Sequence, residues 1–164
     1  MTVMLKRILL AVAFAGLSSS AFAAPGSLFG DLFAKGPSHA HAASGHLVIT
    51  VNIATQEMTV EDDWHTVYTF DVSTGRPGHA TPTGHFAPVR MNEIWYSSKY
   101  ENAPMPWSIF FHGGYAIHGT TDLKHLGHVA SHGCVRLDPK NAKLLYDLVK
   151  EVGMQNTKVT LINS

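Results

Sequence analysis

The chain has 164 residues, a length that favours one folded domain with a proper hydrophobic core. Twelve Lys and Arg residues balance twelve Asp and Glu residues, so the composition gives no general attraction to nucleic acid or to anionic membranes. Charged residues make up 15% and apolar residues 45%, which excludes wholesale disorder. The single cysteine, Cys134, excludes an internal disulfide framework and a multi-cysteine zinc finger.

The first 23 residues have the organisation of a secretory signal peptide. A positively charged start precedes the apolar run of residues 8–17, and residues 21–23 (Ala-Phe-Ala) form a small-x-small cleavage site. The apolar run covers ten residues, well short of the roughly 20 that an uncleaved membrane anchor needs. We therefore expect export to the periplasm or cell envelope, with no integral membrane span in the mature chain.

Residues 24–45 are rich in Ala, Gly, Pro and Ser, which is typical of a flexible lead-in. The folded domain is expected over residues 46–164. Its first part alternates apolar and polar residues with the period of a strand, which predicts a hairpin from residues 46–53 and 57–61. Residues 66–72 are β-branched and aromatic, and they predict a third strand.

The rest of the domain contains further strands and one confident helix. Gly and Pro residues predict a loop over 73–86, followed by strand-rich stretches at 86–96 and 107–117. Asp138 is a suitable N-cap for an amphipathic helix that Gly153 ends, and a last strand follows at 158–162. The sequence therefore predicts a mainly β single domain with one principal helix near the C-terminus.

The chemistry of the chain is expected around Cys134. A cysteine attacks as the thiolate, and a nearby imidazole is the usual group that generates it. Gly133 leaves room for a substrate and lets successive N–H groups turn toward one point, as an oxyanion hole requires. If residues 132–136 are extended, His132, Cys134 and Arg136 share one face. These residues predict an acyl-transfer site that binds an anionic group. We expect its thiol to ionise below the usual pKa near 8.5.

The same residues resemble the signature of a known family. His118-Gly-Thr, followed by Ser131-His-Gly-Cys-Val-Arg-Leu, is similar to the motif of the L,D-transpeptidase catalytic domain, also called the YkuD domain. The loop Thr-Pro-Thr-Gly-His-Phe at 81–86 and the run that precedes His118 also resemble this family. The resemblance covers residues 46–164 and implies a β-sandwich-like catalytic fold that needs no cofactor.

The resemblance implies a role for each matching residue. Cys134 is the nucleophile that takes an acyl group from a peptidoglycan tetrapeptide stem, with release of D-alanine. His118, sixteen residues earlier, is the general acid and base, and the backbone carbonyl of Gly119 orients it. His132 supports the cysteine loop, whose amides stabilise the oxyanion. Contacts with the substrate are expected from Ser131, Gly133, Arg136 and Tyr115.

Several alternatives remain open from the residues alone. Spacing does not decide whether His118 or His132 takes the thiol proton. Arg136 stands where many family members carry Asn, and it suits a substrate carboxylate as well as a scaffold ion pair. Tyr115 also suits a core position. No metal-hydrolase motif appears among the histidines at 112, 118, 125, 128 and 132; His-Glu-x-x-His, for example, is absent, and we expect no metal.

We therefore expect a peptidoglycan-modifying L,D-transpeptidase that carbapenems acylate and that passes its acyl group to an amine. The sequence does not reveal whether the acceptor is a second stem peptide, a lipoprotein lysine, a free D-amino acid or water. No nucleic-acid partner is expected. One alternative is a cysteine-dependent amidase or carboxypeptidase that uses water, because sequence does not reveal how well the pocket excludes water. Another alternative is a non-catalytic cell-wall-binding module.

Overall fold

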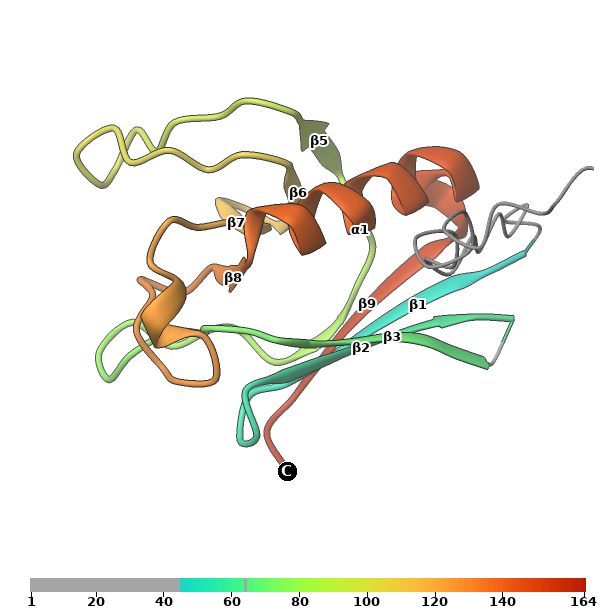
Figure 1. Ribbon diagram of the computed structural model, residues 1–164, viewed down its shortest axis with the longest axis horizontal. Helices are drawn as coiled ribbons and strands as arrows, with labels where there is room; N and C mark the ends of the chain where they lie inside the picture. The colour runs from blue at the N-terminus through green and yellow to red at the C-terminus, as the bar shows by residue number, and fades with distance from the viewer. Residues whose placement is uncertain (1–44, 64) are drawn as a thin grey trace, which may run out of the picture. The chain divides into compact units, whose positions relative to one another are not determined.

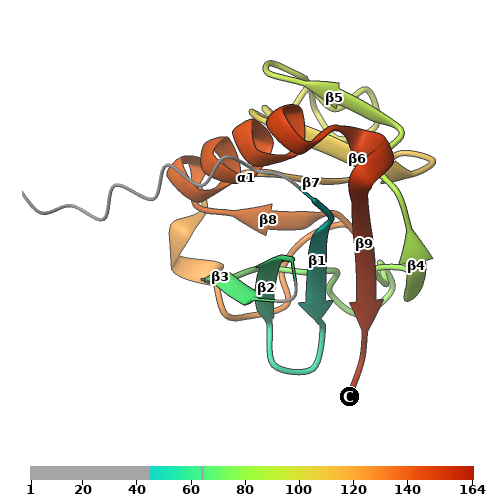
Figure 2. The same cartoon turned by 90° about the vertical axis from the view of Figure 1, so that its right-hand side faces the viewer.

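The computed structural model describes residues 45–63 and 65–164. The predicted signal peptide and residues 24–44 of the predicted lead-in lie outside the described residues. Two sheets and one long helix, α1 (Pro139–Val152), build the domain. Figures 1 and 2 show the smaller sheet and α1 on one side and the larger sheet on the other. Within the described ranges, no helix has both the length and the apolar character needed to cross a bilayer.

The larger sheet has five strands in the order β3-β2-β1-β9-β4. Its strands are β1 (Leu47–Asn52), β2 (Glu57–Asp62), β3 (His65–Asp71), β4 (Gly84–Phe86) and β9 (Thr157–Ile162). The pair β1 and β2 is an antiparallel hairpin, whereas β1 and β9 run parallel. The predicted hairpin, third strand and final strand are therefore confirmed, with ends that differ by one or two residues.

The smaller sheet has four strands in the order β5-β6-β7-β8. Its strands are β5 (Arg90–Asn92), β6 (Ser108–His112), β7 (Tyr115–Gly119) and β8 (Val135–Leu137). The last two run parallel, and the chain between them includes the short 3₁₀ helix η1 (Leu123–His125). A second 3₁₀ helix, η2 (Met154–Asn156), joins α1 to β9.

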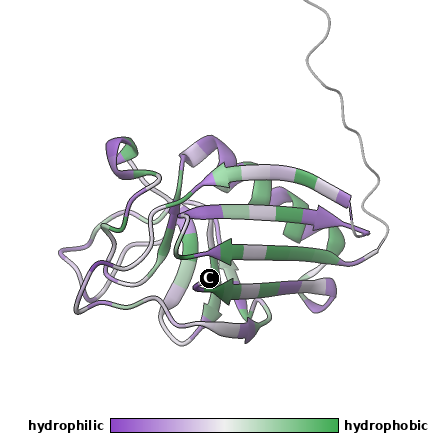
Figure 3. Cartoon of the chain, turned by 90° about the horizontal axis from the view of Figure 1, so that it is seen from below, coloured by the Kyte–Doolittle hydropathy of each residue, from purple (hydrophilic) through white to green (hydrophobic). Residues whose placement is uncertain are grey.

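The hydrophobic core lies between the two sheets and α1. Alternate residues of β1 (Leu47, Ile49 and Val51) are fully buried, as the period of a strand requires. Helix α1 buries one face, including Leu145 and Val149, against β6 and β7. Each such side chain contributes about 1.5–3 kcal/mol when it leaves water. Figure 3 shows hydrophobic and hydrophilic residues alternating along the strands of the larger sheet.

Helix α1 begins and ends as the sequence predicts. The Asp138 side chain accepts a hydrogen bond from the backbone N–H of Lys140 at 2.8 Å, and Gly153 follows the last helical residue. The mainly β fold with one principal helix near the C-terminus is therefore confirmed.

Candidate active site

One pocket, with a volume of about 830 Å³, contains both the cysteine and the first histidine of the motif. Strands β7 and β8 supply His118 and Arg136 to its lining, and the loop from residue 93 to residue 106 supplies several of the other lining residues. The lining residues that matter to the chemistry are Arg90, Tyr100, His118, His132, Cys134 and Arg136.

Pairing of β7 with β8 determines which side chains face this pocket. The register sets Ile117 beside Val135 and His118 beside Arg136. Ile117 and Val135 are buried in the main core, so the neighbouring residues in each strand face the other side. The condition that residues 132–136 are extended is not met at His132, because β8 begins at Val135 and Gly133 has a φ of +113°.

Cys134 directly precedes β8, and it is half-buried. Its Sγ atom is 3.9 Å from the carbonyl oxygen of Gly114. Burial raises the pKa of the thiol, while a backbone hydrogen bond at Ala116 and the positive charge of Arg136 lower it to a smaller extent. The expectation of a thiol that ionises below the usual pKa is therefore wrong for this state, because the sequence does not reveal how much water the fold removes.

His118 lies on β7 with only 6% of its surface exposed. Its Nδ1 atom is 2.8 Å from the carbonyl oxygen of Gly119. A carbonyl only accepts, so Nδ1 carries the proton and Nε2 is left with a free lone pair. Burial lowers the pKa of His118 to about 4, opposed by the Gly119 contact and aided by Arg136. At neutral pH the resting site therefore pairs a neutral thiol with a neutral imidazole.

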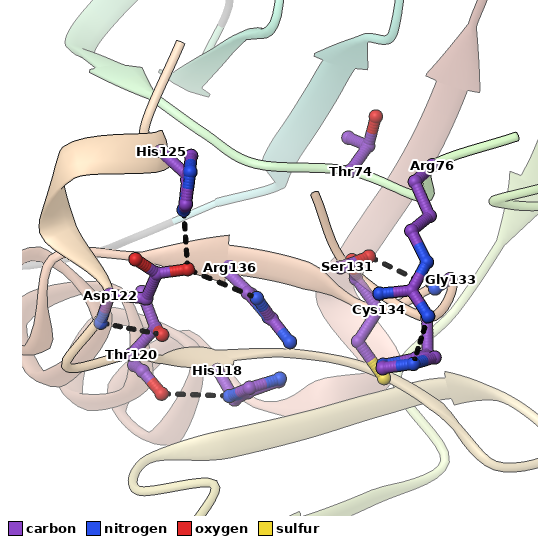
Figure 4. Close-up of polar contacts among 12 residues, drawn as sticks. Thr74, Arg76, His118, Thr120, Asp122, His125, Ser131, Gly133, Cys134 and Arg136 are labelled. Carbon is purple, nitrogen blue, oxygen red and sulfur yellow. Dashed lines mark hydrogen bonds and ion pairs between the residues drawn. The ribbon is translucent and has the colours of Figure 1, made fainter. Parts of the chain in front are cut away.

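His132 has a different setting. The Nη2 atom of Arg76 is 2.7 Å from its Nε2 atom, and Figure 4 shows the Arg76 side chain reaching the cysteine loop. An arginine side chain only donates, so this nitrogen accepts and its lone pair is occupied. His132 is therefore poorly placed to take the thiol proton through Nε2, and the geometry favours His118 as the base.

The loop from residue 131 to residue 134 is closed by its own hydrogen bonds. The Ser131 hydroxyl accepts from the backbone N–H of Gly133 at 2.9 Å and donates to the carbonyl of Cys134 at 2.6 Å. Thr81 donates to the carbonyl of Gly133 at 2.9 Å, and its oxygen accepts from the N–H of Gly75 at 2.8 Å. Ser131 is fully buried. In this state the Gly133 amide is already used within the loop.

Gly133 is also fixed by the ring of Tyr115. A Cβ atom on Gly133 would lie 2.5 Å from Cε1 of that ring, far inside van der Waals contact, and its positive φ disfavours a side chain as well. Tyr115 packs against the main core, and it is not among the residues that line the pocket. The structure thus places the Tyr115 ring against Gly133 of the cysteine loop.

Arg136 faces the pocket and also has a carboxylate partner. Its Nη1 atom is 3.8 Å from Oδ2 of Asp122, which lies 2.7 Å from Nδ1 of His125; Figure 4 shows this chain of contacts. The His125 contact is the main reason that the pKa of Asp122 is lowered. Both interpretations of Arg136, as scaffold residue and as substrate ligand, fit this position.

Three of these residues are not singled out by the sequence. Arg76, Thr81 and Asp122 act through contacts with motif residues that are distant along the chain, and only the loop containing Thr81 carries a family signal. His125 ends η1 and is paired with Asp122. Across residues 45–63 and 65–164, no three His, Cys, Asp or Glu side chains gather as a metal-binding group.

Comparisons with known proteins agree on one family. A model described as the YkuD L,D-transpeptidase catalytic domain matches residues 46–161. The chain is 32% identical over 132 residues to YciB of Bacillus subtilis (strain 168), whose name assigns it to the L,D-transpeptidases; the match covers 71% of this chain and 66% of that protein.

Solved structures show the same fold. An L,D-transpeptidase from Stackebrandtia nassauensis is similar with a TM-score of 0.65 and 27% identity, over 75% of this chain and 58% of that one. The L,D-transpeptidase LdtMt1 in complex with imipenem has a TM-score of 0.65 at 20% identity, over 73% of this chain and 60% of that one. The chain thus covers less than two thirds of the length of each of these three proteins.

Proposed function

Since this chain belongs to the family of YkuD L,D-transpeptidase catalytic domains, we propose that it modifies peptidoglycan by acyl transfer through Cys134. One observation carries the proposal. A single pocket holds a free thiol and a buried imidazole whose Nε2 lone pair is available. Those are the two groups that a cysteine acyltransferase needs.

The proposed reaction has two steps. In the first, Sγ of Cys134 attacks the carbonyl carbon at the L-centre of the diaminopimelate residue, while Nε2 of His118 takes the thiol proton. The tetrahedral intermediate collapses, the bond to D-alanine breaks, and His118 gives the proton to the departing amine. In the second step an acceptor amine attacks the thioester, His118 removes its proton, and the thiol is restored with that proton.

The neutral resting states of Cys134 and His118 determine when the proton moves during the first step. Because burial raises the pKa of Cys134 and lowers that of His118, a stable thiolate–imidazolium pair is disfavoured before substrate binds. The proton therefore moves to His118 as the new bond forms. The positive charge of Arg136, beside His118 in the strand register, favours the sulfur anion that develops during this transfer.

The charge of the pocket suits an acidic peptide. Three cationic side chains line it, Arg90, Lys99 and Arg136, together with two carboxylates. The guanidinium of Arg90 lies over the rings of Trp95 and Phe110, 4.3 and 3.9 Å from their centroids. A stem peptide carries several carboxylates, so these cations give it complementary partners. The acceptor in this proposal is an amine, from a second stem or a lipoprotein lysine.

Residues 1–23 support a second part of the proposal, export to the periplasm through a cleaved signal peptide. The mass of the protein recovered from the periplasmic fraction tests it. We expect a chain that begins at Ala24, and a cytoplasmic protein that retains Met1 would contradict export.

Acylation by a carbapenem tests two points: which residue is the nucleophile, and whether water hydrolyses the acyl-enzyme. We expect imipenem, the ligand of the similar LdtMt1 structure, to add once to the protein, on the peptide that contains Cys134. Intact-protein mass spectrometry measures the adduct, and Cys134→Ser is the control that should stay unmodified. A long-lived adduct supports transfer to an amine, since the pocket then excludes water. Rapid hydrolysis favours the hydrolase alternative, and an adduct at another residue would refute the site.

A further inference from the structure

His132 is held by side chains from two loops that are distant from it in the sequence. Arg76 contacts its Nε2 atom at 2.7 Å, and Tyr100 stacks on its ring with centroids 4.2 Å apart and planes at 23°. The ring of His79 meets it edge-on at 4.7 Å. The backbone N–H of Arg76 donates to the carbonyl of Ser131 at 3.0 Å, which anchors Arg76 beside the motif. Position and orientation of the imidazole are therefore fixed.

The contact with Arg76 also determines which nitrogen of His132 carries the proton. The guanidinium has five N–H donors and no acceptor, so Nε2 of His132 accepts with its lone pair. A neutral ring then carries its proton on Nδ1. Partial burial lowers the pKa of His132, and the neighbouring charges of Arg76, His79, Arg136 and Lys99 lower it further. The ring is therefore neutral at physiological pH.

The described residues give the proton on Nδ1 no hydrogen-bond acceptor. Across residues 45–63 and 65–164, the hydrogen bond that the structure gives to the His132 side chain is the one at Nε2. The ring lines the pocket that contains Cys134. Beside it, the amide of Gly133 is already donated to the Ser131 hydroxyl at 2.9 Å. The oxyanion of an acyl-transfer intermediate needs preorganised donors. The amide of Gly133 is not free to be one of them in this state.

We propose that Arg76 is a positioning residue that fixes His132 as an Nδ1–H donor to the acyl oxygen of the bound substrate. This role rests on the proposed function, because it needs an acyl group on Cys134. His132 then stabilises the oxyanion and keeps its proton throughout, while His118 moves the protons of the reaction. The two histidines of the motif thus have different roles. His118, whose Nδ1 contacts the Gly119 carbonyl, transfers protons, whereas His132, whose Nε2 accepts from Arg76, donates a hydrogen bond.

Nitrogen NMR of the histidine-labelled protein tests the tautomer directly. The signals of His132 are identified by their loss in His132→Gln. We expect the Nδ1–H tautomer in the wild type at pH 7. Arg76→Met removes every donor at similar length and should give a mixture of tautomers, whereas Arg76→Lys retains a donor and should restore the wild-type pattern. Lys140→Gln removes one positive charge at the exposed start of α1 and should change nothing.

Rates of acylation by imipenem test the donor role. Loss of one oxyanion donor costs roughly 10²–10³ in rate, and Arg76→Met only redistributes the tautomers. We therefore expect its maximal rate to fall about tenfold with little change in the half-saturating concentration, and Arg76→Lys to recover most of the rate.

Two results would overturn the inference: an Nε2–H or charged ring in the wild type at pH 7, or wild-type acylation by Arg76→Met. A wild-type protein that is never acylated refutes the proposed function and the donor role with it. In that case the NMR spectrum still decides, on its own, whether Arg76 controls the tautomer of His132.

Discussion

Burial of His118 as a neutral ring should cost the folded protein stability in mild acid. The side chain is 6% exposed, and burial lowers its pKa from 6.5 to about 4. The unfolded chain takes up a proton at this histidine as the pH falls through about 6.5, whereas the folded protein does so only near pH 4. Between these values the free energy of unfolding falls as pH falls. At about 1.4 kcal/mol per pH unit the full loss is roughly 3 kcal/mol, of which about 2 kcal/mol is reached at pH 5.

Urea denaturation of the wild type and of His118→Gln at pH 7.5 and pH 5 measures this effect. The wild type should lose about 2 kcal/mol more than the variant between the two pH values, because other titrating groups contribute equally to both proteins. Cys134→Ser alters the same pocket but keeps the histidine, so it should follow the wild type. Equal pH dependence in the wild type and in His118→Gln would refute the burial of a neutral imidazole.

Three further predictions concern the thiol, the cysteine loop and the helix. Iodoacetamide should label Cys134 slowly at pH 7 and rapidly only above the usual thiol pKa near 8.5, because burial raises its pKa; rapid labelling at pH 6 would indicate a resting thiolate. Gly133→Ala should destabilise the protein by about 1–3 kcal/mol and abolish acylation by imipenem, because the new Cβ would lie 2.5 Å from the Tyr115 ring; an unchanged urea midpoint would contradict this. Asp138→Ala should lower the free energy of unfolding by about 1 kcal/mol and leave acylation unchanged, because it removes only the cap on the Lys140 N–H; a slower acylation rate would contradict this separation.

Elements whose signals are local in the sequence could be predicted. Helix α1 has its cap at Asp138, its apolar period and its closing Gly153 within one continuous segment. The hairpin of β1 and β2 likewise carries its alternation and its turn in adjacent residues. Strand β8 could not be predicted, because three residues from Val135 to Leu137 give no period, and its pairing with β7 forms it.

In the candidate site, too, the residues with a local sequence signal could be predicted and those that depend on distant contacts could not. The motif predicts Cys134 and His118 as a pair, and the structure sets them in one pocket. The hydrogen bond from Arg76 to His132 could not be predicted, because the two residues are 56 positions apart in the sequence. The pKa directions of the thiol and the buried imidazole also depend on burial that several distant strands produce together, so no local pattern reports them.

The central claim is that Cys134 carries the acyl group of a tetrapeptide stem. Incubation with disaccharide-tetrapeptide containing diaminopimelate, followed by an acid quench and intact-protein mass spectrometry, tests it most directly. We predict a single adduct equal to the donor without its terminal D-alanine, on the peptide that contains Cys134, with one equivalent of D-alanine released. Added amine should discharge the adduct, and His118→Gln should form it far more slowly. Release of D-alanine at the wild-type rate by Cys134→Ser would contradict the claim.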